Sequence, residues 1–464
     1  MSFWKRPVFL IPLILASLSC QAVYKALPPT QAGHLNTTQH QIEHQASPTP
    51  LPSTPTRTPS PSPTVAPSTT ATASPTTTLT PSPVHFAVFE DLWGTIRDFY
   101  LYPDFNGLDW DAVYNEYYQR INAGLSDQAF YTIMAEMVTR LGDDHSVFLK
   151  PQEALEEDAG YAGENDYVGI GIITTSIPDR KRISIILVFP HSPAERAGLQ
   201  AHDNILAVDG EPVLDENGFR RDLLRGPVGS VLELTVQTPD QEPRQISMTR
   251  ERIQGSLPVP SELLTTNHGK RVGYLLLTGF TDEIIDDQVS QALIDLSRDG
   301  PLDGLIIDNR QNAGGADDIA RRVLSNFTSG VMGYFVDRNN AQRSLRVIGT
   351  NINGSNRIPL VIIIGPNTVS YGEIFSGVLR DTGRAYLIGE ATEGNMELLW
   401  GYDFEDGSRA WIAREMFRPR NHPDQNWEES GIIPDLIVSS NWDEVTLDTD
   451  PAVVAALEHL DINP

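Results

Sequence analysis

Residues 357–381 read R-I-P-L-V-I-I-I-G-P-N-T-V-S-Y-G-E-I-F-S-G-V-L-R-D. The β-branched apolar run that ends at Gly365 is typical of a buried strand, and helix-forming residues resume at Tyr371. Ser370 is therefore expected on a strand-to-helix turn, where the first backbone N–H groups of the helix are free to hold an oxyanion. A serine in this position is a candidate nucleophile, but it needs a base to take its proton.

Ser370 also fits a purely structural role, because Ser370 and Glu373 form the S-x-x-E pattern of a helix capping box. The identity of a base is equally open at this point. All the lysines of the chain precede the serine; they are Lys5, Lys25, Lys150, Lys181 and Lys270. The choice between cap and nucleophile therefore depends on the other segments of the chain.

Strand and helix patterns alternate along the C-terminal part of the chain, which we assign to a core domain of residues 256–464. Buried strands are predicted at 272–277, 304–310, 359–365 and 385–390, and crossover helices at 284–296, 317–327 and 372–381. This alternation predicts an α/β core with a largely parallel sheet. Sites in such cores lie where the strands end, and both Ser370 and the loop D-N-R-Q-N-A-G-G at 308–315 follow a predicted strand.

Two further segments precede the core. Residues 85–160 carry three amphipathic helix patterns, the last of which runs into L-G-D-D-H-S, so that His145 is expected on a loop. Such a histidine is ordinarily solvated, yet it is the residue type that titrates near neutral pH. Residues 161–255 alternate apolar and polar residues in short runs between turn signals, which predicts a mostly β domain.

The N-terminal end has the composition of an export signal. Residues 1–20 contain a charged start, a short apolar run and L-S-C, and Cys20 is the only cysteine. This pattern resembles a bacterial lipoprotein signal, although a signal peptide cleaved elsewhere is the alternative. Residues 46–83 are almost wholly Pro, Ser and Thr, which predicts that the segment 21–84 is an extended, disordered linker. We expect a lipid anchor at Cys20 on the outer face of the cytoplasmic membrane, or else a periplasmic or extracellular location.

The formal net charge of −27 argues against nucleic acid as a partner. The segment 161–255 resembles a PDZ domain. Its residues Gly169, Ile170, Gly171 and Ile172 look like the loop that holds a C-terminal carboxylate. The resemblance implies protein or peptide partners with free C-terminal tails, and a PDZ domain by itself does not imply an enzyme.

Together, residues 85–438 resemble the C-terminal processing peptidase family, which implies a crotonase-like ββα core. The loop at 308–315 resembles the D-x-R-x-N-x-G-G loop of this family, and N-T-V-S-Y-G-E-I-F resembles its nucleophile segment. The resemblance places the nucleophile at Ser370. It implies oxyanion donors on the Gly314-Gly315 turn and at Tyr371, and a reaction that requires no metal or cofactor.

The following segment, G-E-A-T-E-G-N-M-E-L-L, departs from the family pattern. Asn395 stands where the family has its general-base lysine, and an amide side chain cannot accept a proton. L-G-D-D-H-S and W-E-E-S-G-I-I-P-D instead resemble tricorn protease, a relative with a histidine base and a supporting glutamate. This resemblance implies His145 as the base and Glu428 as its support, with Glu429 as an alternative; possible further support comes from Asp144 and Asn395.

The interpretation is a membrane-tethered, extracytoplasmic serine endopeptidase of the C-terminal processing type. A pseudo-peptidase that binds peptide tails is the main alternative, because the family lysine is lost. A crotonase-like acyl-transfer or hydration enzyme is a third. With a histidine base of ordinary pKa, about 6.5, cleavage is expected to rise through mildly acidic pH. The substrate and the oligomeric state stay open.

Overall fold

The computed structural model describes residues 80–143, 145–161, 167–253, 256 and 258–462. The predicted export signal with Cys20, most of the predicted linker, and Asp144 lie outside these residues. Across the described ranges, no helix has the length and apolar character needed to span a membrane.

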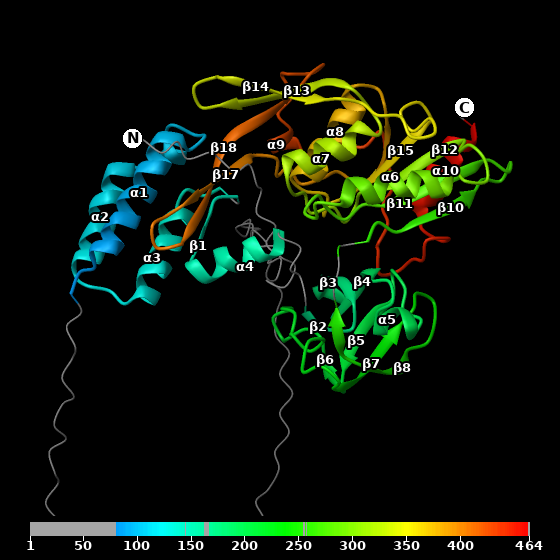
Figure 1. Ribbon diagram of the computed structural model, residues 1–464, viewed down its shortest axis with the longest axis horizontal. Helices are drawn as coiled ribbons and strands as arrows, with labels where there is room; N and C mark the ends of the chain where they lie inside the picture. The colour runs from blue at the N-terminus through cyan, green and yellow to red at the C-terminus, as the bar shows by residue number, and fades with distance from the viewer. Residues whose placement is uncertain (1–79, 144, 162–166, 254–255, 257, 463–464) are drawn as a thin grey trace, which may run out of the picture. The chain divides into compact units, whose positions relative to one another are not determined.

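A largely parallel sheet forms the centre of the C-terminal segment (Figure 1). In the described part of the chain its strand order is β10 (Ser261–Thr265), β11 (Arg271–Leu276), β12 (Gly304–Asp308), β15 (Leu360–Ile364), β16 (Tyr386–Gly389) and β19 (Leu436–Ile437). Only β10 runs antiparallel to its neighbour in this sheet as described. The predicted parallel α/β sheet is therefore confirmed, and every residue of β12 and β15 is buried, as expected for strands covered on both faces.

Helices cover the two faces of this sheet. Alternate strand residues such as Leu305 and Ile362 pack against α6 (Ile285–Leu296), α7 (Asp317–Ser325) and α8 (Tyr371–Asp381). The residues between them, such as Ile306 and Val361, pack against α10 (Pro451–Ile462). This division follows from the strand geometry, in which successive side chains point to opposite faces.

A second, antiparallel sheet was not predicted from the sequence. Its long strand β18 (Arg409–Pro419) lies between β1 (Val147–Leu149) and β13 (Gly330–Asp337), β14 (Gln342–Val347) pairs with β13, and β17 (Leu398–Asp403) also pairs with β18. The short strand β1 comes from the N-terminal helical segment and sets Phe148 opposite Ala410. This pairing carries the residues just before β1 onto the C-terminal segment.

The predicted N-terminal helices are α1 (Pro83–Phe99), α2 (Trp110–Asn122) and α3 (Asp127–Thr139), followed after β1 by α4 (Pro151–Tyr161). The first three helices share one hydrophobic cluster with residues of β17 and β18, including the fully buried Trp411. The helical segment and the second sheet therefore have a common core, although more than 200 residues separate them in sequence.

The predicted β segment has its own core. Its main sheet contains β3 (Ile172–Ile177), β4 (Arg182–Val188), β5 (Asn204–Val208), β6 (Glu211–Pro212), β7 (Val231–Gln237) and β8 (Arg244–Thr249), with α5 (Pro193–Arg196) packed beside it. A separate pair joins β2 (Tyr167–Gly169) to β9 (Glu251–Ile253). Gly171 has a φ of +83°, and a Cβ there would lie 2.2 Å from Ser192 Cβ, so the turn between β2 and β3 requires glycine.

Three short helical turns complete the described elements. They are two 3₁₀ turns at Phe105–Gly107 and Pro178–Arg180, and the single α-turn α9 at Trp427–Ser430.

Candidate active site

Ser370 sits between β15 and α8, as the sequence predicts. Its backbone has φ +56° and ψ −125°, a strained conformation for a residue with a side chain. The strain is held by Glu373, whose Oε2 accepts a 3.0 Å hydrogen bond from the Ser370 N–H. A sharp, strained strand-to-helix turn presents a serine hydroxyl at the edge of a sheet, which is the geometry a nucleophile requires.

The glycine loop 314–315 lies directly against this serine. A Cβ placed on Gly314 would be 2.7 Å from Ser370 Cβ and 3.1 Å from both Ser370 Oγ and the Tyr371 nitrogen. Gly314 therefore borders the space in which an oxyanion on Ser370 would form.

Two of the predicted oxyanion donors have free N–H groups. Within the described residues, the amides of Gly315 and Tyr371 make no hydrogen bond. The Gly314 N–H, in contrast, donates to Asn312 Oδ1 at 2.8 Å. In this structure Gly314 therefore shapes the site through its lack of a side chain, while Gly315 and Tyr371 are available as donors.

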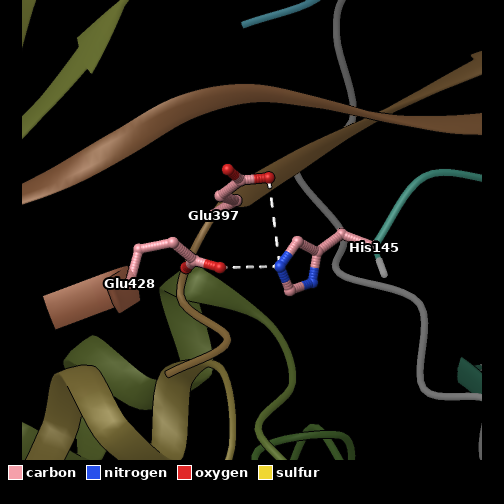
Figure 2. A group of neighbouring side chains, drawn as sticks. All are labelled: His145, Glu397 and Glu428. Atoms are coloured by element: carbon pink, nitrogen blue, oxygen red, sulfur yellow. Dashed lines mark hydrogen bonds and ion pairs between the residues drawn. The ribbon is translucent and has the colours of Figure 1, made fainter. Parts of the chain in front are cut away.

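His145 is brought to Glu428 by the strand pairing of β1 with β18. The imidazole Nε2 lies 2.8 Å from Glu428 Oε1 and 3.9 Å from Glu397 Oε2 (Figure 2). The His145 side chain is only 8% exposed, so the pair is largely shielded from water. Glu429, the alternative partner considered from the sequence, is exposed to solvent. The structure thus joins His145 to the first glutamate of W-E-E-S.

The two carboxylates change the protonation of the imidazole. Burial alone lowers the pKa of His145, but the hydrogen bond to Glu428 and the charges of Glu397 and Glu428 outweigh it and raise the pKa to about 9. Burial raises the pKa of Glu397 to about 7. Burial also opposes ionisation of Glu428, yet its hydrogen bond with His145 keeps the pKa of Glu428 below the usual value. The ordinary histidine pKa assumed from the sequence therefore does not hold here.

Hydrogen bonds to the backbone of residues 394–396 connect the serine turn to the histidine pair. Glu373 accepts from the N–H of Asn395 at 2.9 Å as well as from that of Ser370. The next N–H, that of Met396, donates to Glu428 Oε2 at 2.7 Å. Among the described residues, no hydrogen bond joins Ser370 directly to His145. The Ser370 turn and Glu428 are nevertheless both anchored to the backbone of residues 394–396.

The loop that carries Asn395 holds the site through its backbone. The Gly394 N–H donates to Glu373 Oε1 at 3.0 Å, and the Asn395 N–H donates to Glu373 Oε2. Burial raises the pKa of Glu373 to about 7, although these amides act in the opposite direction. The last lysine before the site, Lys270, instead donates to the carbonyl of Leu460 at 2.8 Å, on α10. Lys270, the last lysine of the sequence, is therefore engaged on α10 instead of at the loop that carries Asn395.

The contacts of two carboxylates near the site, Glu373 and Glu397, could not be predicted from the sequence. The S-x-x-E pattern predicts Glu373 only as a helix cap, whereas its carboxylate also accepts hydrogen bonds from the 394–395 loop. No sequence pattern assigns a role to Glu397, which follows Asn395 by two residues. Tyr102, from the loop after α1, donates its hydroxyl to Glu397 Oε1. The spacing from Asn395 was the only sequence signal for Glu397, because its partners come from a distant segment.

The predicted tail-binding loop at Gly169–Ile172 lies in the β segment. Ile170 is buried, and its carbonyl accepts from the N–H of Ala194 at 2.9 Å, which ties the loop to α5. The Tyr167 ring packs against this loop, because a Cβ on Gly169 would lie 2.7 Å from Tyr167 Cε2.

Three family profiles match the chain. Peptidase family S41 matches residues 271–438, the tricorn protease C1 domain matches residues 87–139, and a PDZ domain matches residues 185–238. The profiles follow the three segments read from the sequence, and they support the expected fold class.

Curated relatives match most of the chain. The carboxyl-terminal-processing protease of Synechocystis sp. is 31% identical over 380 residues, which cover 79% of this chain and 85% of that protein. A protein of the same description from Picosynechococcus sp. is 30% identical, and the match covers 75% of this chain and 81% of that protein. The carboxy-terminal processing protease CtpB of Bacillus subtilis is 25% identical, with coverage of 71% and 66%.

Solved structures agree on the fold. The photosystem II D1 C-terminal processing protease aligns with a TM-score of 0.53 at 24% identity, covering 77% of this chain and 93% of that chain. A putative S41 protease from Bacteroides fragilis aligns with a TM-score of 0.55 at 17% identity, with coverage of 80% and 97%.

Proposed function

Because the chain belongs to peptidase family S41, the serine-type carboxyl-terminal-processing peptidases, we propose that it cleaves proteins with Ser370, His145 and Glu428 instead of a serine–lysine pair. The observation that carries this proposal is the buried ion pair of His145 with Glu428, 2.8 Å long, at the loop where Asn395 replaces the family lysine. An imidazole supplies the base that an amide side chain cannot.

The tautomer follows from the contact with Glu428. When neutral His145 donates its Nε2–H to Glu428 Oε1, its lone pair remains on Nδ1. Nδ1 then takes the proton of Ser370 as the hydroxyl oxygen attacks the scissile carbonyl, and later returns it to the leaving amine. Glu428 orients the ring and stabilises the imidazolium. Ser370 and His145 have to approach for this step, and catalytic contacts of this kind often tighten only when substrate binds.

The oxyanion is assigned to the free amides of Gly315 and Tyr371. Each such donor contributes on the order of 3 kcal/mol to the stabilisation of the transition state. Gly314 keeps the space open, since a side chain there would collide with Ser370.

Serine reactivity tests the proposal directly. A fluorophosphonate probe should label the full chain at Ser370, and labelling should be lost in Ser370→Ala and equally in His145→Ala, because members of one catalytic unit are not additive. Asn395→Ala should keep most of the labelling, since its contribution to the site is a backbone N–H. Circular dichroism checks that each variant is folded.

Full labelling of His145→Ala would contradict the role of His145 as the base, while Ser370 would remain the proposed nucleophile. A folded wild-type chain that resists the probe would instead favour the alternative of a pseudo-peptidase that binds tails without cutting them.

Two further features complete the proposal. The PDZ domain recognises substrates by their C-terminal carboxylate through the loop at Gly169–Ile172, and Cys20 carries a lipid that tethers the enzyme to the outer face of the cytoplasmic membrane. The first is supported by the glycine turn between β2 and β3. The second is supported by the single cysteine at the end of an apolar N-terminal run.

A further inference from the structure

One carboxylate beside the catalytic pair has no role in the proposed chemistry. The Glu397 side chain is only 2% exposed, and its Oε1 accepts the Tyr102 hydroxyl. Its Oε2 has no hydrogen-bond partner among the described residues and faces His145 Nε2 at 3.9 Å (Figure 2). Burying a carboxylate oxygen without a donor is unfavourable. The free oxygen therefore points to a cation that completes the cluster.

Three ligand atoms converge at this point. One atom from each of His145, Glu397 and Glu428 lies within 4.8 Å of the others. A tetrahedral zinc ion with ligands at about 2.0–2.1 Å holds neighbouring ligand atoms about 3.3 Å apart. The observed separations of 2.8 Å and 3.9 Å from the imidazole Nε2 lie on either side of that value. Side-chain shifts of roughly half an ångström would complete the geometry.

Both carboxylates are already oriented by their outer oxygens. The Met396 N–H holds Glu428 Oε2 at 2.7 Å, and the Tyr102 hydroxyl holds Glu397 Oε1. Each glutamate thus presents its other oxygen to the imidazole, which is the arrangement that outer contacts impose on metal ligands. One imidazole and two carboxylates suit Zn²⁺ and leave a fourth position for water.

We propose that His145, Glu397 and Glu428 form an inhibitory zinc site that captures the catalytic histidine. Zn²⁺ takes the position of the proton between Nε2 and Glu428. An imidazolium releases its Nε2 proton to solvent and keeps the proton on Nδ1, whereas a neutral imidazole shifts its single proton from Nε2 to Nδ1 and releases none. A neutral imidazole bound through Nε2 carries its remaining proton on Nδ1, so it has no lone pair for the Ser370 hydroxyl. The inhibition rests on the proposed role of His145 as the base, whereas the binding of zinc does not.

Metal binding is measured without cleavage in the full chain carrying Ser370→Ala, after treatment with a chelator. Calorimetry with Zn²⁺ should show one ion per chain, and Co²⁺ should give the visible absorption of a tetrahedral site. Glu397→Gln, which retains an acceptor for Tyr102, should weaken binding by about tenfold or more. Glu429→Gln is the matched control, because Glu429 is exposed and adjacent to Glu428, and it should bind as tightly as the parent.

Absence of binding, or equal affinity in Glu397→Gln and the parent, would overturn the zinc site. If Glu397→Gln fails to fold, Tyr102→Phe is tested in its place. Loss of the hydroxyl that orients Glu397 should weaken zinc binding by about tenfold. Unchanged zinc affinity in Tyr102→Phe would count against the site.

Inhibition is tested on the wild-type serine. Zn²⁺ should slow fluorophosphonate labelling, a chelator should restore it, and Glu397→Gln should resist the effect. Zinc that binds at the cluster without slowing labelling would refute the inhibition. The failure of the histidine base itself would appear separately, as labelling of His145→Ala in the presence of chelator.

Discussion

At the scale of single residues, the protonation of His145 depends on the two carboxylates beside it. His145 is held between Glu428 and Glu397, and their charges raise its pKa to about 9 against the effect of burial. The protonated pair stabilises the fold fully below the unfolded histidine pKa of about 6.5, and this contribution is lost as pH rises through about 9. The proposed mechanism needs the opposite protonation state, since only a neutral imidazole accepts a proton.

Cleavage should therefore increase with pH well above the range of an ordinary histidine. In the presence of a chelator, log kcat/KM should rise with an apparent pKa near 9, because this parameter reports the free enzyme. Glu428→Gln should move the rise to lower pH as it removes a negative charge beside the ring. Glu429→Gln should leave the profile in place, and a wild-type rise centred near 6.5 would contradict the raised pKa.

Gly314 provides a second residue-scale prediction. Gly314→Ala places a Cβ 2.7 Å from Ser370 Cβ and 3.1 Å from Ser370 Oγ, where the oxyanion would form. We expect kcat/KM to fall by about a hundredfold or more with the chain still folded. Gly407→Ala is the matched control, because its φ of +85° imposes the same backbone strain while its nearest neighbour, Pro151 Cβ, lies 3.7 Å from the added atom. Equal losses in both variants would assign the effect to backbone strain.

At the scale of elements, short strands decide which segments meet. β1 contains only three residues, yet its pairing with β18 places His145 beside a glutamate that lies 283 residues further along the chain. In the PDZ domain, the three-residue pairing of β2 with β9 similarly precedes the loop at Gly169–Ile172, where Gly171 makes the turn into β3. His145 and the loop at Gly169–Ile172 thus each lie next to one terminus of a short strand.

The loop at Gly169–Ile172 should distinguish a free C-terminus from a blocked one. A peptide with an apolar tail should bind the Ser370→Ala chain about tenfold more tightly than its C-terminal amide, because charge-assisted hydrogen bonds to backbone N–H groups contribute about 1.5–3 kcal/mol. Fluorescence anisotropy measures both affinities, with a peptide of scrambled tail sequence as the control. Indistinguishable affinities for the acid and the amide would end the proposal of carboxylate recognition.

At the scale of the whole molecule, the chain combines three folded segments with an N-terminal region of different composition. Helices α1 to α3 share a core with the second sheet, so the N-terminal segment is part of the peptidase instead of a separate module. The PDZ domain keeps a core of its own. The pair of His145 with Glu428 therefore depends on the joint folding of segments from the two ends of the described chain.

Anchoring is the prediction that belongs to this scale. Cys20→Ser should shift the protein from the membrane fraction to the soluble fraction while leaving fluorophosphonate labelling of Ser370 unchanged, since Cys20 lies far in sequence from the folded segments. Fractionation followed by mass spectrometry of the mature N-terminus checks both the location and the lipid. A membrane-bound wild-type chain whose N-terminus is unmodified would contradict the anchor.

Much of the fold could be predicted from the sequence, because periodicity reports burial locally. The continuous apolar run at 360–364 became the buried strand β15, the turn after it placed Ser370 before α8, and the parallel α/β sheet followed from the alternation of strands and helices. The PDZ segment and the lack of a lysine at position 395 were equally visible, since each is a property of a short stretch of residues.

Only the tertiary structure decided which ionisable side chains lie close enough to interact. Pairing of β1 with β18 cannot be read from three residues, and without it neither the choice of Glu428 over Glu429 nor the presence of Glu397 could be derived. The raised pKa of His145 likewise arises from two carboxylates that reach it only after folding. The sequence by itself determined the elements and the position of Ser370 on the turn before α8, because these depend on neighbouring residues. The charged cluster around His145 depended on contacts between distant segments, which only the folded chain brings together.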